Sequence, residues 1–147
     1  MSKSFFHPGP IPADYSSEII LKATKSNCGA HNIFLGQIRA DNKINGSVTA
    51  IQYSAQTQLA EQEYDNIIQE LHGKFDVENV HVRHSIGTVK TSEICLFIFI
   101  SSPHRSACQL AMDWLIEAVK KRVPIFAKEM VSENEYSWKV NTEKQTS

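Results

Sequence analysis

The sequence lacks the features that mark membrane and exported proteins. Its longest uninterrupted apolar run, from Ile94 to Ile100, has seven residues, whereas a membrane-spanning helix needs roughly 20. The first twelve residues contain one lysine and no apolar core of the length found in secretory signals. We therefore expect no contact with a membrane and a cytoplasmic location.

The sequence also lacks a large excess of either positive or negative charge, and its number of cysteines is odd. Fifteen Lys and Arg residues against sixteen Asp and Glu residues give a formal net charge of −1. Because phosphate neutralisation requires a basic surplus, we expect no nucleic acid as the main partner. The three cysteines, Cys28, Cys95 and Cys108, lie in apolar-leaning segments, a pattern typical of buried thiols in a reducing compartment rather than of a disulfide frame.

Metal and nucleotide motifs are equally scarce. His81 and His84 are three residues apart in a predicted strand, so their side chains point to opposite faces and do not share an ion. No other spacing of His, Cys or carboxylate residues resembles a structural zinc set. The six glycines are scattered and form no phosphate-binding loop. We therefore expect neither a metal nor another bound cofactor.

What is present suits one globular domain. The chain has 147 residues, of which 41% are hydrophobic and 21% charged, enough for one well-buried core but not for two. We treat residues 1–147 as a single domain. Its proline-rich start, 1–13, is predicted to be an extended arm, and its end, 141–147, to be frayed.

Hydrophobic periodicity predicts an α+β fold, a largely antiparallel sheet with two long helices packed on it. The predicted strands cover residues 29–39, 47–54, 79–89, 93–101, 125–131 and 136–140. Asn45-Gly46 is a strong turn signal that makes the second strand the returning partner of the first. The fourth strand is apolar on both faces, as is typical of the middle of a sheet.

The predicted helices differ in length. A short one runs from Ser16 or Ser17 to about Thr24, and an amphipathic one from Gln56 to Leu71, closed by Gly73. A second long helix starts with Ser102 as its cap and Pro103 at its first position, and Pro124 ends it.

The start of this last helix is the most informative local feature. Helix N-termini favour acidic residues, yet His104 and Arg105 stand here beside free backbone N–H groups. Such a cluster of donors suits phosphate or carboxylate; the alternative is that both residues are solvated surface groups. Arg39 at a strand end, and Lys120 and Lys128 on either side of Pro124, have the same two interpretations.

His104 and Cys108 are four residues apart on a predicted helix, so a thiolate activated by histidine is one possible centre for sulfur chemistry. The competing interpretation makes Cys108 a small core residue beside Ala107 and Ala111, and we favour it because free cysteines are mostly buried.

Three segments together resemble a known family. Gly36-Gln37-Ile38-Arg39 at a strand end, Ser101-Ser102-Pro103-His104-Arg105 before a long helix, and KKRVPIFAKE at 120–129 are similar, in order and spacing, to the large catalytic subunit of molybdopterin synthase. The similarity runs from about Pro10 to Trp138. It implies an α/β hammerhead-type fold, a homodimer, and a small ubiquitin-like sulfur-carrier subunit as partner.

The resemblance also implies a reaction. The carrier ends in Gly-Gly and brings sulfur as a C-terminal thiocarboxylate, and the large subunit uses it to convert cyclic pyranopterin monophosphate, a small pterin, to molybdopterin. Arg39, His104 and Arg105 match substrate-binding positions, the latter two acting across the dimer interface. Lys120 matches a catalytic lysine.

One departure from the family pattern concerns the last segment. The family has Trp followed by a second catalytic lysine where this chain has Phe126 and Ala127. Lys128 is the neighbouring candidate, but in a regular strand it points to the opposite face, so it serves as the auxiliary catalytic cation only if the strand is bulged. A divergent paralogue that binds the carrier without catalysis is therefore an alternative.

Overall fold

The computed structural model describes residues 4–44, 46–132 and 136–138. Within these residues the helices are α1 (Tyr15–Ala23), α2 (Thr57–Lys74) and α3 (Arg105–Arg122). The strands are β1 (Phe6–Pro8), β2 (Ala30–Gln37), β3 (Asn42–Lys43), β4 (Gly46–Ala55), β5 (Asn79–Lys90), β6 (Ile94–Ser102), β7 (Ile125–Val131) and β8 (Tyr136–Trp138). The predicted strand at residues 139–140 and the frayed end at 141–147 lie outside the described residues.

The strands form one eight-stranded sheet in the order β2-β6-β5-β4-β7-β8, with β1 added to β5 and β3 added to β4. Every neighbouring pair is antiparallel except β1 and β5. The α+β fold with a largely antiparallel sheet is therefore confirmed. The predicted extended arm is more than a lead-in, because part of it pairs with β5 as β1.

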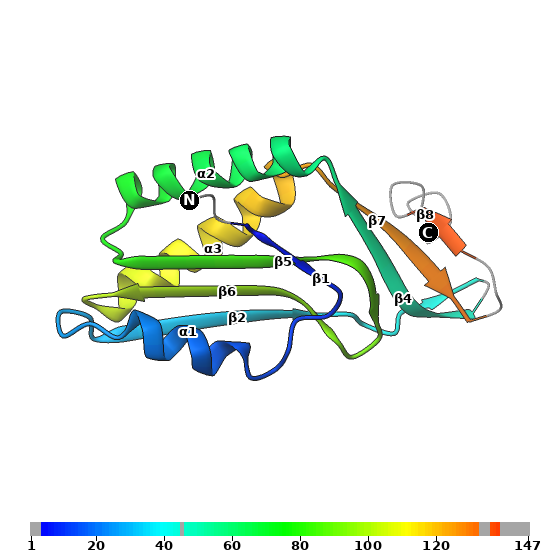
Figure 1. The fold of residues 1–147 in the computed structure, drawn as a ribbon, viewed down its shortest axis with the longest axis horizontal. Coiled ribbons are helices and arrows are strands. Elements are labelled where there is room, and N and C mark those ends of the chain that lie inside the picture. Colours follow the sequence, from blue (N-terminus) through cyan, green and yellow to red (C-terminus); the bar gives the residue numbers. More distant parts are fainter. Residues whose placement is uncertain (1–3, 45, 133–135, 139–147) are drawn as a thin grey trace.

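Strand β6 separates two apolar layers. Phe97 and Phe99, both fully buried, pack with α1 through Ile19. The alternate residues, among them Ile98 and Ile100, belong to the larger core beneath α2 and α3. Figure 1 shows α1 beside β2 and β6, and α2 and α3 on the other side of the strands. The prediction that this strand is buried on both faces is confirmed.

The sheet bends where β5 changes partners. Residues 79–84 of β5 pair with β6, and residues 87–90 pair with β4. Gly87, the first residue of the second stretch, has φ +97°, a conformation that glycine adopts at little cost. Figure 1 shows β4 and β7 turning away from the line of β2, β6 and β5. The bend brings the ends of β2 and α3 next to β4 and β7.

Two predicted helix boundaries are wrong. Helix α3 begins at Arg105 with His104 as its N-cap residue, and no side chain caps it. Ser102 instead ends β6, and its hydroxyl donates to the His104 carbonyl. Pro103 thus precedes the helix rather than opening it. Gly73 does not close α2, which continues to Lys74, since one glycine costs a helix only about 1 kcal/mol.

The predicted returning hairpin is also wrong. Strand β4 does not pair with β2; it pairs with β5 and β7. A two-residue strand, β3, takes the place of the hairpin partner, with Lys43 opposite Gly46 and Asn42 opposite Ser47. The turn signal therefore predicted the reversal of the chain correctly, but not which strand pairs with β4 across the turn.

Candidate functional site

A cavity of about 540 Å³ lies inside the bend of the sheet. It is bounded by the ends of β2 and α3, by β4 and β7, and by the middle of β5. Its titratable lining residues are Arg39, Asp41, Tyr53, His84, Cys95, Lys120 and Glu129. Apolar groups, such as Phe34, Leu96 and Val119, make up much of the rest. A part-apolar pocket with a few convergent polar groups is the usual form of a small-molecule site.

Arg39 reaches the cavity mouth through an irregularity in β2. The register with β6 shifts between Gly36 and Gln37, and a Cβ at Gly36 would lie 3.1 Å from the Leu96 Cβ. The side chain of Arg39 is 85% exposed and forms an ion pair with Asp41, with Nε 2.7 Å from Oδ1. This hydrogen bond raises the pKa of Arg39, so the guanidinium is a permanent cation at the mouth.

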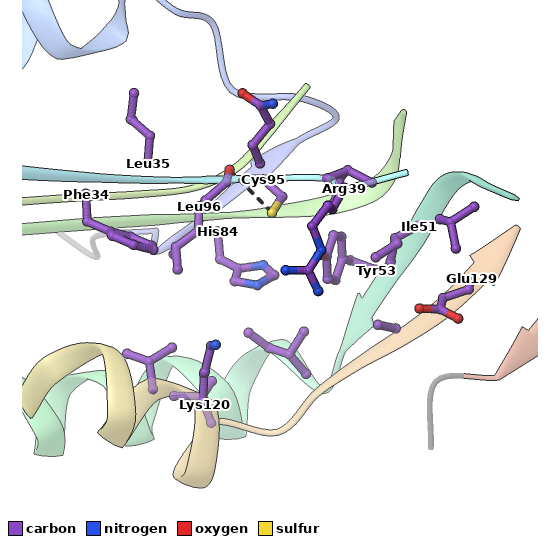
Figure 2. A pocket seen from close by; sticks show the side chains of 18 of the residues that line it. Phe34, Leu35, Arg39, Ile51, Tyr53, His84, Cys95, Leu96, Lys120 and Glu129 are labelled. Atoms are coloured by element: carbon purple, nitrogen blue, oxygen red, sulfur yellow. Dashed lines mark hydrogen bonds between the residues drawn. The ribbon is translucent and has the colours of Figure 1, made fainter. Parts of the chain in front are cut away.

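Lys120 enters the same cavity from the last turn of α3. Figure 2 shows its side chain pointing toward His84 and the Arg39 guanidinium. The helix end is held in place by Arg122, which binds Glu63 at 2.6 Å and Glu70 at 2.7 Å, both on α2. Two cations predicted separately, Arg39 and Lys120, are therefore brought together.

Lys128 does not reach the cavity. The register between β4 and β7 is regular from Ile125 to Glu129, and the one irregularity lies at Val48 and Ala50 of β4. Residues 125, 127 and 129 line the cavity, so Lys128 lies on the other face. The bulge that a catalytic role of Lys128 required is not present.

A buried ion pair lies at the β7 side of the cavity. Lys43 Nζ is 3.5 Å from Glu129 Oε1, and the two side chains are 14% and 2% exposed. Glu129 lines the cavity on the same face as Ala127. Lys43 was not singled out from the sequence, because it belongs to a polar loop and its contact with β7 depends on the fold.

His104 and Arg105 lie at the opposite end of α3 from Lys120, and both are exposed. At 1.5 Å per helical residue, about 24 Å of helix separates His104 from Lys120. Neither residue lines the cavity of its own chain.

Cys108 belongs to the core. Its side chain is 2% exposed and packs in the cluster beneath α2 and α3. The core interpretation of Cys108 is confirmed, and its burial leaves the thiol with no access for a substrate.

Tyr53, His84 and Cys95 were missed as site residues. Tyr53 and His84 pack edge to face with ring centroids 4.8 Å apart, and Cys95 Sγ contacts the Gly36 carbonyl at 3.5 Å. Burial raises the pKa of Tyr53 and of Cys95, so both are neutral at pH 7. The sequence contains one signal for His84, a histidine at a core-facing position of a predicted strand, but that signal was interpreted only in terms of metal binding.

Among the described residues, no group of three or more His, Cys, Asp or Glu side chains is placed to hold a metal ion. No helix in that part of the chain has both the length and the apolar character needed to cross a membrane.

Comparison with known sequences gives a consistent result. Residues 11–122 match the family model described as "MoaE protein". The chain is 38% identical over 134 residues to the molybdopterin synthase catalytic subunit of Bos taurus, covering 90% of this chain and 68% of that protein. It is 38% identical over 120 residues to the catalytic subunit of Culex quinquefasciatus, covering 80% and 76%.

Solved structures agree. The crystal structure of molybdopterin synthase from Staphylococcus aureus superposes with a TM-score of 0.82 at 27% identity, covering 95% of this chain and 98% of that one. A complex of subunits 1 and 2 of the molybdopterin-converting factor from Helicobacter pylori 26695 gives 0.79 at 16% identity, covering 96% and 91%, and so shows a shared fold. The family match, the identity to catalytic subunits and the shared architecture together establish that this chain belongs to the MoaE protein family.

Proposed function

We propose that this chain is the catalytic subunit of a molybdopterin synthase, a sulfurtransferase that converts cyclic pyranopterin monophosphate to molybdopterin. The observation that carries the proposal is the meeting of Lys120 and Arg39 at one cavity. These residues come from two of the three segments on which the resemblance rests. The protein takes its sulfur from the C-terminal thiocarboxylate of a small ubiquitin-like carrier and acts in the cytoplasm.

Each cation suits a different part of this chemistry. Arg39 at the mouth offers a planar set of donors for the substrate phosphate, in exchange for its contact with Asp41. Lys120, in the last turn of α3, stabilises the oxyanion that forms when the acyl carbon of the carrier is attacked, or supplies a proton when the cyclic phosphate opens. Lys128 has no part at the reacting carbon, because β7 is regular there.

A second copy of the chain completes the site with His104 and Arg105. Among the described residues, β2 is paired on one side only, with β6, and Leu35 on this edge strand is 44% exposed. Gly29, the residue before β2, donates to the carbonyls of Ser102 and Pro103. If the β2 edges of two copies paired antiparallel about a twofold axis, the start of β2 in one copy would lie beside the end of β2 in the other. The start of α3, held next to the start of β2 by these hydrogen bonds, would lie there too.

The size of β2 supports this arrangement. Its eight residues span about 27 Å at 3.4 Å each, close to the separation along α3 between His104 and Lys120. The twofold pairing would therefore bring His104 of one copy near Lys120 of the other, although the two residues lie far apart within one chain. Arg39 from one copy, and His104 and Arg105 from the other, then form one anion pocket per subunit.

The test is reconstitution. The purified chain is incubated with thiocarboxylated carrier and cyclic pyranopterin monophosphate, and the dithiolene product is assayed. Product formation supports the proposal, and Cys108→Ser should leave it unchanged because the carrier supplies the sulfur. Carrier binding without product would favour the second candidate.

The second candidate is a carrier-binding protein without catalysis. The observation in its favour is Ala127, which lines the cavity where the resemblance implies a lysine. If Ala127→Lys produced dithiolene while the natural chain produced none, this candidate would replace the first.

A further inference from the structure

We propose that His84 is a further catalytic residue of this cavity, with its Nε2 atom accepting a proton from the water that cleaves the bond between the transferred sulfur and the carrier's acyl carbon. This inference rests on the proposed function and adds to it a base that the family resemblance did not supply. It starts from the position of His84 at the bend of the sheet, where β5 leaves β6 for β4.

The hydrogen bonding of the ring determines which nitrogen is available. His84 Nδ1 lies 2.8 Å from the Ser85 carbonyl oxygen. A carbonyl only accepts, so Nδ1 carries the hydrogen and Nε2 carries the lone pair of the neutral ring. No described residue forms a hydrogen bond with Nε2, and this atom is not among the polar atoms sealed from solvent. The lone pair is therefore open to the cavity that His84 lines.

The surroundings hold the ring in a fixed orientation. Its centroid is 4.8 Å from that of Tyr53, at an interplanar angle of 89°, and 6.5 Å from that of Phe6, at 70°. The residue is 8% exposed. Burial lowers the pKa of His84, against a smaller opposite effect of the Ser85 hydrogen bond, so the ring is neutral and able to accept a proton at pH 7.

A neutral base facing a cation is the arrangement that acyl hydrolysis requires. Figure 2 shows the His84 ring and the Lys120 side chain pointing toward each other from β5 and α3. Lys120 is suited to the oxyanion and His84 to the attacking water. Tyr53 and Cys95, both kept protonated by burial, do not compete as bases.

The step balances without a redox partner. After the thiocarboxylate sulfur has bonded to the pterin side chain, it is also bonded to the carrier's acyl carbon as a thioester. Water oxygen forms a bond to that carbon while one water proton passes to His84 Nε2. The carbon–sulfur bond then breaks, its electron pair leaves with sulfur, and the imidazolium returns the proton to this thiolate. The products are a carrier carboxylic acid, which ionises, and the thiolated pterin.

The first test uses the assembled enzyme in single turnover, with release of the carrier carboxylate and formation of dithiolene as readouts. His84→Gln keeps a polar side chain but accepts no proton, and should slow release by about 10²-fold or more. The matched control is His7→Gln, whose ring also contacts a backbone carbonyl through Nδ1 but lies outside the cavity lining; its rate should stay within about twofold of the unchanged chain.

Chemical rescue separates a base from a structural role. His84→Ala opens space in the cavity, and added imidazole should restore the rate at least tenfold. The rescued rate should rise with the basicity of substituted imidazoles, whereas refilling of a packing void would follow only their size. Wild-type rates in His84→Gln, or loss of rate without imidazole rescue in a folded His84→Ala protein, would overturn the inference while leaving the proposed function intact.

A measurement without substrate completes the design. Nitrogen NMR of the full chain at pH 7 should show His84 as the neutral Nδ1–H tautomer. An Nε2–H ring or a charged ring would overturn the inference about His84, whatever the synthase assay shows. A synthase assay that yielded no product would instead count against the proposed function.

Discussion

The buried ion pair between Lys43 and Glu129 predicts a large and specific loss of stability. Its side chains are 14% and 2% exposed, with Nζ and Oε1 3.5 Å apart. Lys43→Met removes the ammonium and leaves a carboxylate in the wall of the cavity. Breaking a buried pair on one side costs about 3–5 kcal/mol. The partial exposure of Lys43 places the expected loss near the lower limit, about 3 kcal/mol.

The expected loss is easily measured. For a domain of this size each kcal/mol corresponds to roughly 2–4 °C, so Lys43→Met should lower the melting temperature by about 6–12 °C, followed by circular dichroism. The double variant Lys43→Met, Glu129→Gln should recover much of this loss, because it leaves no buried charge.

A matched surface pair provides the control. Lys121 and Glu117 are 3.7 Å apart on α3, with side chains 75% and 66% exposed. Lys121→Met should change the stability by less than about 1 kcal/mol, since solvent screens such pairs. A melting temperature of Lys43→Met equal to that of Lys121→Met would refute the reasoning.

Three further predictions concern the reaction. Lys120→Ala should slow single-turnover sulfur transfer by about 10²-fold or more, and an unchanged rate would remove the catalytic assignment. Lys128→Ala should leave the rate nearly unchanged, because its side chain lies on the other face of β7, and Ala127→Lys should preserve or raise the rate. Arg105→Ala should weaken pterin binding by about 1.5–3 kcal/mol, measured by calorimetry on the dimer, and a structure with Arg105 distant from every Arg39 would contradict the shared pocket. Deleting the carrier's terminal Gly-Gly should abolish sulfur transfer, because these two small residues let the carrier's tail approach Lys120 through a narrow channel. Sulfur transfer at the original rate would exclude this route for the tail.

The sequence by itself determined most of the local structure. A continuous apolar run identified the fourth predicted strand, 93–101, as buried on both faces, and the 3.6-residue period located both long helices. These are local properties, because a strand or helix displays its period wherever it packs. The resemblance, rather than any property of either side chain, also predicted Arg39 and Lys120 as site residues, and both line the cavity.

Only the tertiary structure decided which residues share a site. The bend at Gly87 and the pairing of β4 with β5 and β7 bring Lys120 to Arg39, expose His84 Nε2 to the cavity and join Lys43 to Glu129. The regular register of β7 turns Lys128 away. Periodicity contains no record of strand order or of where a sheet bends, since both arise from packing between segments distant in the chain. The positions of His104 and Arg105 relative to the cavity depend on a still higher level, the association of two copies.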